Sequence, residues 1–228
     1  MSLVRYRGVF MASNISESLT RKVYNGLIEE IVEGRLHGGE RLDDAKIMKL
    51  YGVSRTPVRE ATLLLEKDGF LETVGHKGIF VKTLSVQAVK DIYFVREIME
   101  CNAAKLAANR ITDDDILILE NTLNKMENLA EDQILSGYPR LDMEFHNTIV
   151  SICGVELLAH LCSQMSLQRA SILLRGENYI GNTTRYNQEH RLILERLAAH
   201  DADGVEAAMR SHIQKGKAGV LTQMMNVS

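Results

Sequence analysis

The stretch GVSRTPVREA at residues 52–61 decides how the N-terminal third of this chain folds. In a helix that begins near Ser54, the side chains of Arg55 and Arg59 lie four residues apart and share one face, with Thr56 beside them. The positions of the opposite face are apolar: Val58, Ala61 and Leu65. An apolar back and a front of arginines and hydroxyls are what a helix needs to pack on a protein core and read DNA.

Two amphipathic helices precede this segment and a hairpin follows it. Apolar residues recur with the 3.6-residue period of a helix. The three expected helices span 19–36, 43–51 and 54–68. Two β-prone runs, at 70–74 and 79–81, flank a turn that contains Gly75 and Gly78. Three helices followed by a hairpin predict a winged helix-turn-helix.

The remainder of the chain, beyond a linker at 82–85, has a helical pattern. Six helices are expected there: 86–109, 113–132, 140–152, 155–176, 183–200 and 202–224. We expect Pro139 to break the chain before the third of them and Thr112 to cap the second. The fold class is therefore mainly α, an N-terminal winged helix-turn-helix plus a C-terminal all-α helical bundle. The predicted parts are a flexible N-terminal extension (1–17), a DNA-binding domain (18–83) and a helical effector-binding and dimerisation domain (84–228).

Composition limits the class of protein. No run approaches 18 apolar residues, so no membrane span is expected, and three cysteines without a CxxC spacing suit the reducing cytoplasm. Residues 1–83 hold 13 basic and 11 acidic side chains, a net charge of +2. Residues 84–228 hold 14 and 19, a net charge of −5. A mildly basic N-terminal part on an acidic partner suits nucleic-acid binding through a small face.

Six side chains are candidates for contact with double-stranded DNA: Ser54, Arg55, Thr56, Arg59, His76 and Lys77. Arginine binds guanine edges or phosphates, and hydroxyls at a helix N-terminus bind phosphates. His76 and Lys77, at the hairpin tip, can reach the backbone or the minor groove. The plain alternative is that the two arginines form a solvated helix face. Their position in a third helix, ahead of a hairpin, favours DNA.

These motifs resemble the signature of the GntR family of bacterial repressors. The resemblance rests on residues 52–61, on GRLHGGERL at 34–42 and on KGIFV at 77–81, and covers about 18–82. It implies that the main DNA contacts are Arg55, Thr56 and Arg59, and that the wing carries His76, Lys77 and Gly78. Ala45 departs from the pattern, since some relatives have a basic residue there.

Three of the seven histidines combine with an aspartate into a candidate metal site. Asp142 and His146 are four residues apart on one expected helix, while His190 and His212 lie on the apolar stripes of two others. One core histidine is usually only a hydrogen-bonded core residue, but three with an aspartate need a shared partner when buried. A divalent cation supplies that partner. The donor set favours Zn²⁺ or Ni²⁺ and also accepts Mn²⁺.

The same residues resemble the ligand-binding domain of the FadR-type branch of GntR regulators. DMEFH at 142–146, EHR at 189–191 and RSH at 210–212 occur in that domain's order, and the resemblance spans about 86–215. It implies a helical bundle that in many members holds a metal on one Asp and three His. Val155 departs from it, since relatives commonly have Asn there, and we expect this to affect a helix-joining turn.

The resemblance also implies an effector contact. Arg96 matches an arginine that faces the pocket in this branch and suits the carboxylate of an organic acid. The alternative is a surface ion pair with Glu100, four residues on. Arg169 and Arg175 are weaker candidates for the pocket.

Three functional hypotheses follow. The first is a homodimeric regulator, expected to be a repressor and not an enzyme, whose operator affinity depends on a small carboxylate bound at the metal. The second treats the metal as structural or as the signal itself. The third is a metallo-hydrolase fused to a DNA-binding module. It needs a general base, and Glu144 points away from both Asp142 and His146 in a helix.

Overall fold

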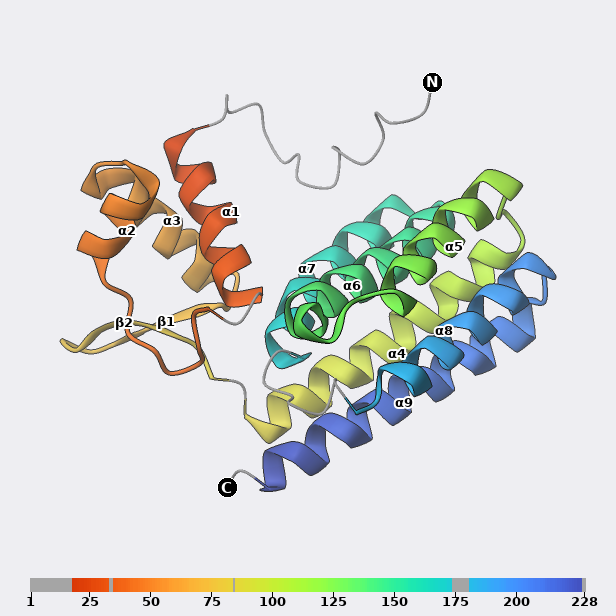
Figure 1. Cartoon of the computed structure of the whole chain (residues 1–228). Helices are drawn as coiled ribbons and strands as arrows, with labels where there is room; N and C mark the ends of the chain where they lie inside the picture. The colour runs from red at the N-terminus through yellow and green to blue at the C-terminus, as the bar shows by residue number, and fades with distance from the viewer. Residues whose placement is uncertain (1–17, 33–34, 84, 174–180, 227–228) are drawn as a thin grey trace. The chain divides into compact units, whose positions relative to one another are not determined.

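A computed structural model describes residues 18–32, 35–83, 85–173 and 181–226. Contacts within the chain define two compact units, and the division between them falls after Thr83 (Figure 1). Each unit has its own buried residues. Among the described helices, none is long and apolar enough to cross a membrane.

The N-terminal unit contains three helices and a two-stranded sheet: α1 (Leu19–Val32), α2 (Asp44–Tyr51), α3 (Arg55–Lys67), β1 (Leu71–Val74) and β2 (Gly78–Val81). Ser18 caps α1, its hydroxyl accepting from the Arg21 amide, and Asp43 caps α2 by accepting from two amides. Gly52 ends α2 with a left-handed φ of 66°. The core is formed by apolar residues from all parts of the unit: Val23, Leu27, Ile31, Ile47, Val58, Ala61, Leu65, Phe70 and Leu71.

The hairpin has a third partner that the sequence did not reveal. β1 and β2 are antiparallel, with Leu71 opposite Val81 and Val74 opposite Gly78. Arg41 forms an isolated bridge with Phe80 on the other side of β2. Pattern analysis missed this segment because a single bridge has no alternation to detect.

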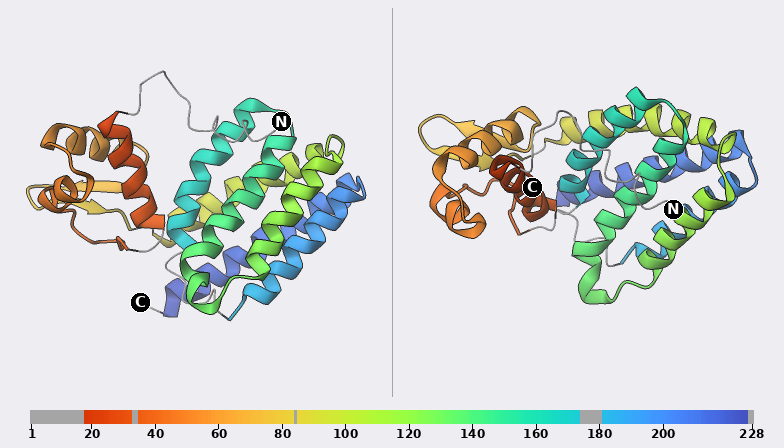
Figure 2. Two further views of the ribbon diagram at one scale, coloured as in Figure 1. Left: turned by 45° about the horizontal axis from the view of Figure 1, so that its top comes forward. Right: turned by 90° about the horizontal axis from the view of Figure 1, so that it is seen from above.

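The C-terminal unit is helical: α4 (Val86–Ala108), α5 (Asp113–Glu127), the 3₁₀ turn η2 (Glu131–Gln133), α6 (Ile134–Ile152), α7 (Glu156–Leu173), α8 (Thr183–Ala198) and α9 (Ala202–Asn226). α4 and α9 run side by side for most of their length, α8 packs on α9, and α6 packs on α5 and α7 (Figures 1 and 2). The predicted mainly-α class, with its winged N-terminal unit, is confirmed.

The three cysteines are core residues. Cys101, Cys153 and Cys162 are buried and form no disulfide. Burial raises the pKa of both the Cys101 and the Cys162 thiol to about 12, so these two stay protonated at neutral pH.

Three predicted boundaries were wrong. α1 ends at Val32 rather than 36, and the amides of Arg35 and Leu36 both return to the carbonyl of Glu30. α5 ends at Glu127 rather than 132, and η2 follows. Pro139 does not precede α6 but lies inside it. Tertiary packing outweighs the proline's lost hydrogen bond, because its neighbour Tyr138 is fully buried and donates to Asn187 of α8 at 2.7 Å.

The α5 capping box offers a test of the local sequence signals. The Asp115 amide donates to the Thr112 hydroxyl at 3.2 Å, and the Thr112 amide donates to the Asp115 carboxylate at 3.1 Å. We expect Thr112→Ala to lower the free energy of unfolding by about 1 kcal/mol, because the first turn loses this partner. Urea denaturation followed by circular dichroism measures it. Asn121→Ala, exposed in the middle of α5, is the control and should be neutral or slightly stabilising.

Candidate metal centre and DNA-binding surface

Helix α3 divides into the two faces that its sequence implies. Arg55, Thr56 and Arg59 are exposed on one face. The positions that pack inward are fully buried: Val58, Ala61 and Leu65. Within the described part of the chain, the Arg55 and Arg59 side chains form no ion pair, whereas Arg35 and Arg191 are engaged by glutamates. An exposed arginine without an internal counter-ion is available to a phosphate or a base edge.

The start of α3 is suited to phosphate. Ser54 occupies the N-cap position in an extended conformation, but its hydroxyl makes no capping hydrogen bond and is exposed. Its hydroxyl and the first-turn amides of α3 are left for an anion at the positive end of the helix.

The wing presents basic groups around a glycine. His76 and Lys77 are exposed in the turn between β1 and β2. Gly78 has φ 115°, and a Cβ there would lie 3.0 Å from Nε of Arg41. Arg41 is itself exposed and was not selected from the sequence, because only its bridge to Phe80 brings it beside the wing.

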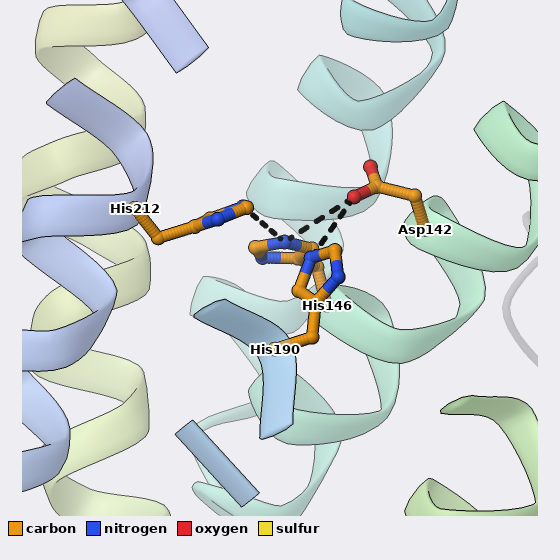
Figure 3. Close-up of side chains that lie close together, drawn as sticks. All are labelled: Asp142, His146, His190 and His212. Carbon is orange, nitrogen blue, oxygen red and sulfur yellow. Dashed lines mark hydrogen bonds and ion pairs between the residues drawn. The ribbon is translucent and has the colours of Figure 1, made fainter. Parts of the chain in front are cut away.

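Asp142, His146, His190 and His212 converge inside the C-terminal unit (Figure 3). The first two come from α6, His190 comes from α8 and His212 from α9. All four are buried, and each offers a ligand atom within 4.8 Å of the others. The structure thus brings together every residue that the sequence selected for this cluster.

The imidazole Nε2 atoms face the centre of the cluster. Nε2 of His190 lies 3.1 Å from Oδ1 of Asp142, and Nε2 of His146 lies 3.8 Å from the same oxygen. Nε2 of His146 is 3.2 Å from Nε2 of His212. Phe145 packs against His190 with its ring centroid 4.9 Å away and contributes an apolar wall.

A carboxylate of α4 lies behind His146. Oε2 of Glu100 is 2.7 Å from Nδ1 of His146, and Glu100 also accepts from Nε of Arg96 at 2.6 Å and from Nη2 at 3.2 Å. Burial alone would raise the pKa of Glu100. The charge of Arg96 and the contact with His146 outweigh burial and hold that pKa well below its ordinary value. Glu100 is therefore an ionised group in the interior.

Arg96 is buried rather than at the surface. Its side chain is 4% exposed and its guanidinium lies over the ring of Tyr93, 5.1 Å from the centroid. The ion pair with Glu100 that the sequence allowed does form, but in the interior. Any ligand that Arg96 contacts must share its guanidinium with Glu100.

A second carboxylate lies behind His212. Oε2 of Glu189 is 2.9 Å from Nδ1 of His212, and Oε1 of Glu189 is 3.2 Å from Nζ of Lys215. The sequence indicated Glu100 only as a partner of Arg96, and it indicated neither glutamate as a partner of a histidine, because both of these contacts join different helices. Glu189 had one local signal, its position directly before His190 in the EHR motif.

The positions of the two carboxylates favour a bound cation. With the Nδ1 atoms of His146 and His212 each facing a carboxylate, we assign the hydrogen of each ring to Nδ1, which leaves a lone pair on Nε2. The Nε2 atoms of His146 and His212 lie 3.2 Å apart, so their lone pairs repel unless a cation or a proton is between them. Three imidazoles and a carboxylate are ligands that Zn²⁺, Ni²⁺ and Mn²⁺ accept, so these residues fit a divalent metal.

Glu144 is not placed to act as a general base at the centre. Glu144 accepts from the hydroxyl of Thr122 on α5 at 3.3 Å and so faces away from the cluster, as its sequence position implied.

The two weaker candidates for the effector pocket cannot be placed: the side chain of Arg169 and all of Arg175 lie outside the described residues.

Comparison with known proteins assigns the family. Residues 19–81 match the bacterial regulatory proteins of the gntR family, and residues 91–215 match the FCD domain. The chain therefore belongs to the GntR family, in the branch with an FCD domain, which is the FadR-type branch predicted from its motifs. It is a DNA-binding transcription regulator and not an enzyme.

Individual relatives agree with this assignment. The chain is 32% identical to the Nta operon transcriptional regulator of Aminobacter aminovorans, covering 78% of this chain and 82% of that protein. It is 26% identical to the HTH-type transcriptional repressor RspR of Escherichia coli, covering 89% of each. Among solved structures, E. coli McbR/YncC has the same fold, with a TM-score of 0.81 at 23% identity over 91% of this chain and 99% of that one.

Removing either α3 arginine should weaken DNA binding. We expect Arg55→Ala or Arg59→Ala to cost about 1–3 kcal/mol in affinity for a duplex that the wild type selects from a random library. If an arginine binds a phosphate, the dependence of log K on log salt should also become shallower by about one unit. Fluorescence anisotropy measures both quantities. Lys125→Ala, exposed on α5, is the control, and equal losses in all three variants would remove the special role of α3.

Proposed function

We propose that this regulator binds operator DNA with an affinity set by a small carboxylate at a divalent metal in the FCD domain. The observation that carries the proposal is the buried convergence of three Nε2 atoms and the Asp142 carboxylate. Such a set of polar groups is costly in an apolar interior without a cation. The three free, buried cysteines and the expected operator DNA support our proposal that it acts in the cytoplasm, and the repressor among its relatives supports repression.

The charge around the centre favours an anionic effector. Glu100 is paired with Arg96 and Glu189 with Lys215, so these two pairs are neutral. A divalent metal on Asp142 and three neutral imidazoles leaves one positive charge in a buried place. A carboxylate on the metal would neutralise that charge.

The coordination number bears on the choice of metal. Four protein ligands complete a tetrahedral Zn²⁺ site, which is the geometry of structural zinc. An effector on the metal needs a further position, which octahedral Ni²⁺ or Mn²⁺ provides and five-coordinate Zn²⁺ also allows. Arg96 is our candidate for a second contact with the effector. The alternative, a structural or signalling metal, predicts that DNA affinity follows the metal and ignores organic acids.

We also propose a homodimer through the outer faces of α4 and α7. The two helices pack through Met99, Ala103, Leu158 and Cys162. Apolar side chains next to these contacts are exposed, with fractions of 60%, 50%, 69% and 43%: Phe94, Ile98, Leu157 and Leu161. Exposed apolar groups gathered at one helix pair are typical of an interface. A second copy is the occupant, because paired helix-turn-helix units read paired half-sites.

Metal content and ligand response test the first proposal. We expect about one metal per wild-type chain, its loss in His190→Ala, and a rise in melting temperature of the wild type alone with one member of a panel of small carboxylates. His160→Ala is the matched control, because this histidine is exposed on α7. Metal-free wild type that responds like His190→Ala would refute the metal site. If the wild type contains metal but no carboxylate raises its melting temperature, the carboxylate effector is refuted and the alternative of a structural or signalling metal stands.

The dimer is tested by introducing negative charges into its apolar face. We expect Ile98→Glu combined with Leu161→Glu to convert the dimer to a monomer at micromolar concentration, since the glutamates would be buried without partners. Analytical ultracentrifugation measures the mass. Leu117→Glu is the control, because Leu117 is 56% exposed on α5. A wild type that sediments as a monomer contradicts the proposal.

A further inference from the structure

We infer that Glu100 and Glu189 are positioning residues of the metal centre, each holding one ligand histidine with its Nε2 directed at the metal. The inference rests on the proposed metal site and adds two residues that do not themselves bind the ion. Both carboxylates occupy the side of an imidazole that faces away from Asp142. Each is also backed by a cation of its own helix or of α9.

Glu100 is the more buried of the two. It is 5% exposed; Arg96 on the same helix contacts both of its oxygens, and Oε2 also lies 2.7 Å from Nδ1 of His146 on α6. The two bonds from Arg96, 2.6 Å from Nε to Oε1 and 3.2 Å from Nη2 to Oε2, fix the plane of the carboxylate. A fixed carboxylate then determines the direction of the His146 ring.

Glu189 of α8 orients the ring of His212 in the same way. Its Oε2 contacts Nδ1 of His212 at 2.9 Å, while Lys215 at 3.2 Å and Arg185 at 4.0 Å lie at Oε1. Glu189 and His190 are consecutive, so one turn of α8 provides both a ligand and the group that orients the ligand of α9.

The reason for such carboxylates lies in the two forms of neutral histidine. A hydrogen on Nε2 would block the metal, whereas a carboxylate at Nδ1 holds the hydrogen there and makes Nε2 more basic. Because Glu100 belongs to α4, it also makes this helix part of the metal centre. Metal binding then restrains α4 together with α6, α8 and α9.

The test measures metal affinity in carboxamide variants. We expect Glu100→Gln and Glu189→Gln each to weaken binding of Ni²⁺ or Zn²⁺ about 10-fold to 100-fold in competition with a chelator. The controls are Glu97→Gln, which removes an α4 ion pair with Arg210, and Glu195→Gln, exposed on α8. Both should bind metal like the wild type. Glu100→Gln removes the negative charge that neutralises buried Arg96, and if this variant fails to fold, Glu189→Gln alone tests the inference. Glu189→Gln should fold, because its cationic partner Lys215 is half exposed and stays in contact with water.

A spectroscopic measurement on metal-free protein separates this inference from the metal proposal. In ¹⁵N spectra of the histidine rings, His146 and His212 should carry their hydrogen on Nδ1. Glu100→Gln should alter this for His146 alone, and Glu189→Gln for His212 alone. Unchanged ring signals together with wild-type metal affinity in both variants would overturn the inference. A wild type that shows the expected ring signals but binds no metal would instead overturn the proposed function.

Discussion

The C-terminal unit is organised around the cost of placing three imidazoles and a carboxylate in an apolar interior. His190 is fully buried, and Asp142, His146 and His212 are nearly so. Each comes from a helix that also supplies the core, so α6, α8 and α9 cannot pack without bringing these groups together. The same step buries Glu100 and Arg96 of α4. Folding of the bundle and assembly of the polar cluster are therefore one process.

The N-terminal unit has no buried cluster of charged groups among its described residues. Its core needs only the apolar backs of three helices and a hairpin, and the polar fronts stay in water. For that reason Arg55 and Arg59 can remain without internal partners, while the buried arginine of the other unit cannot. The N-terminal unit thus leaves these two arginines in water, whereas the C-terminal unit buries Arg96 together with Glu100.

Much of this architecture could be predicted from the sequence. Helical periodicity located the helices, the Gly-containing turn located the hairpin, and the spacing of Asp142 and His146 placed them on one face. The prediction that a helix starts after Pro139 was wrong, because burial of Tyr138 outweighs the one hydrogen bond that the proline cannot make. That burial depends on contacts with other helices, such as the hydrogen bond to Asn187 of α8, which local sequence does not reveal. The contacts of Glu100 with His146 and of Glu189 with His212, and the Arg41 bridge, were not predicted, because each joins elements far apart in the chain. Local patterns reveal faces of helices, but not which side chains meet between them.

The strand-like segment beside β2 affects how such proteins evolve. It is joined to the wing by main-chain bonds, from the Leu42 amide to Ile79 and from the Val81 amide to Glu40. Main-chain bonds do not depend on side-chain identity, so mutations at the exposed tip around His76 and Lys77 leave the wing in place. Residues at the tip can therefore vary between related proteins while the scaffold that carries them is kept.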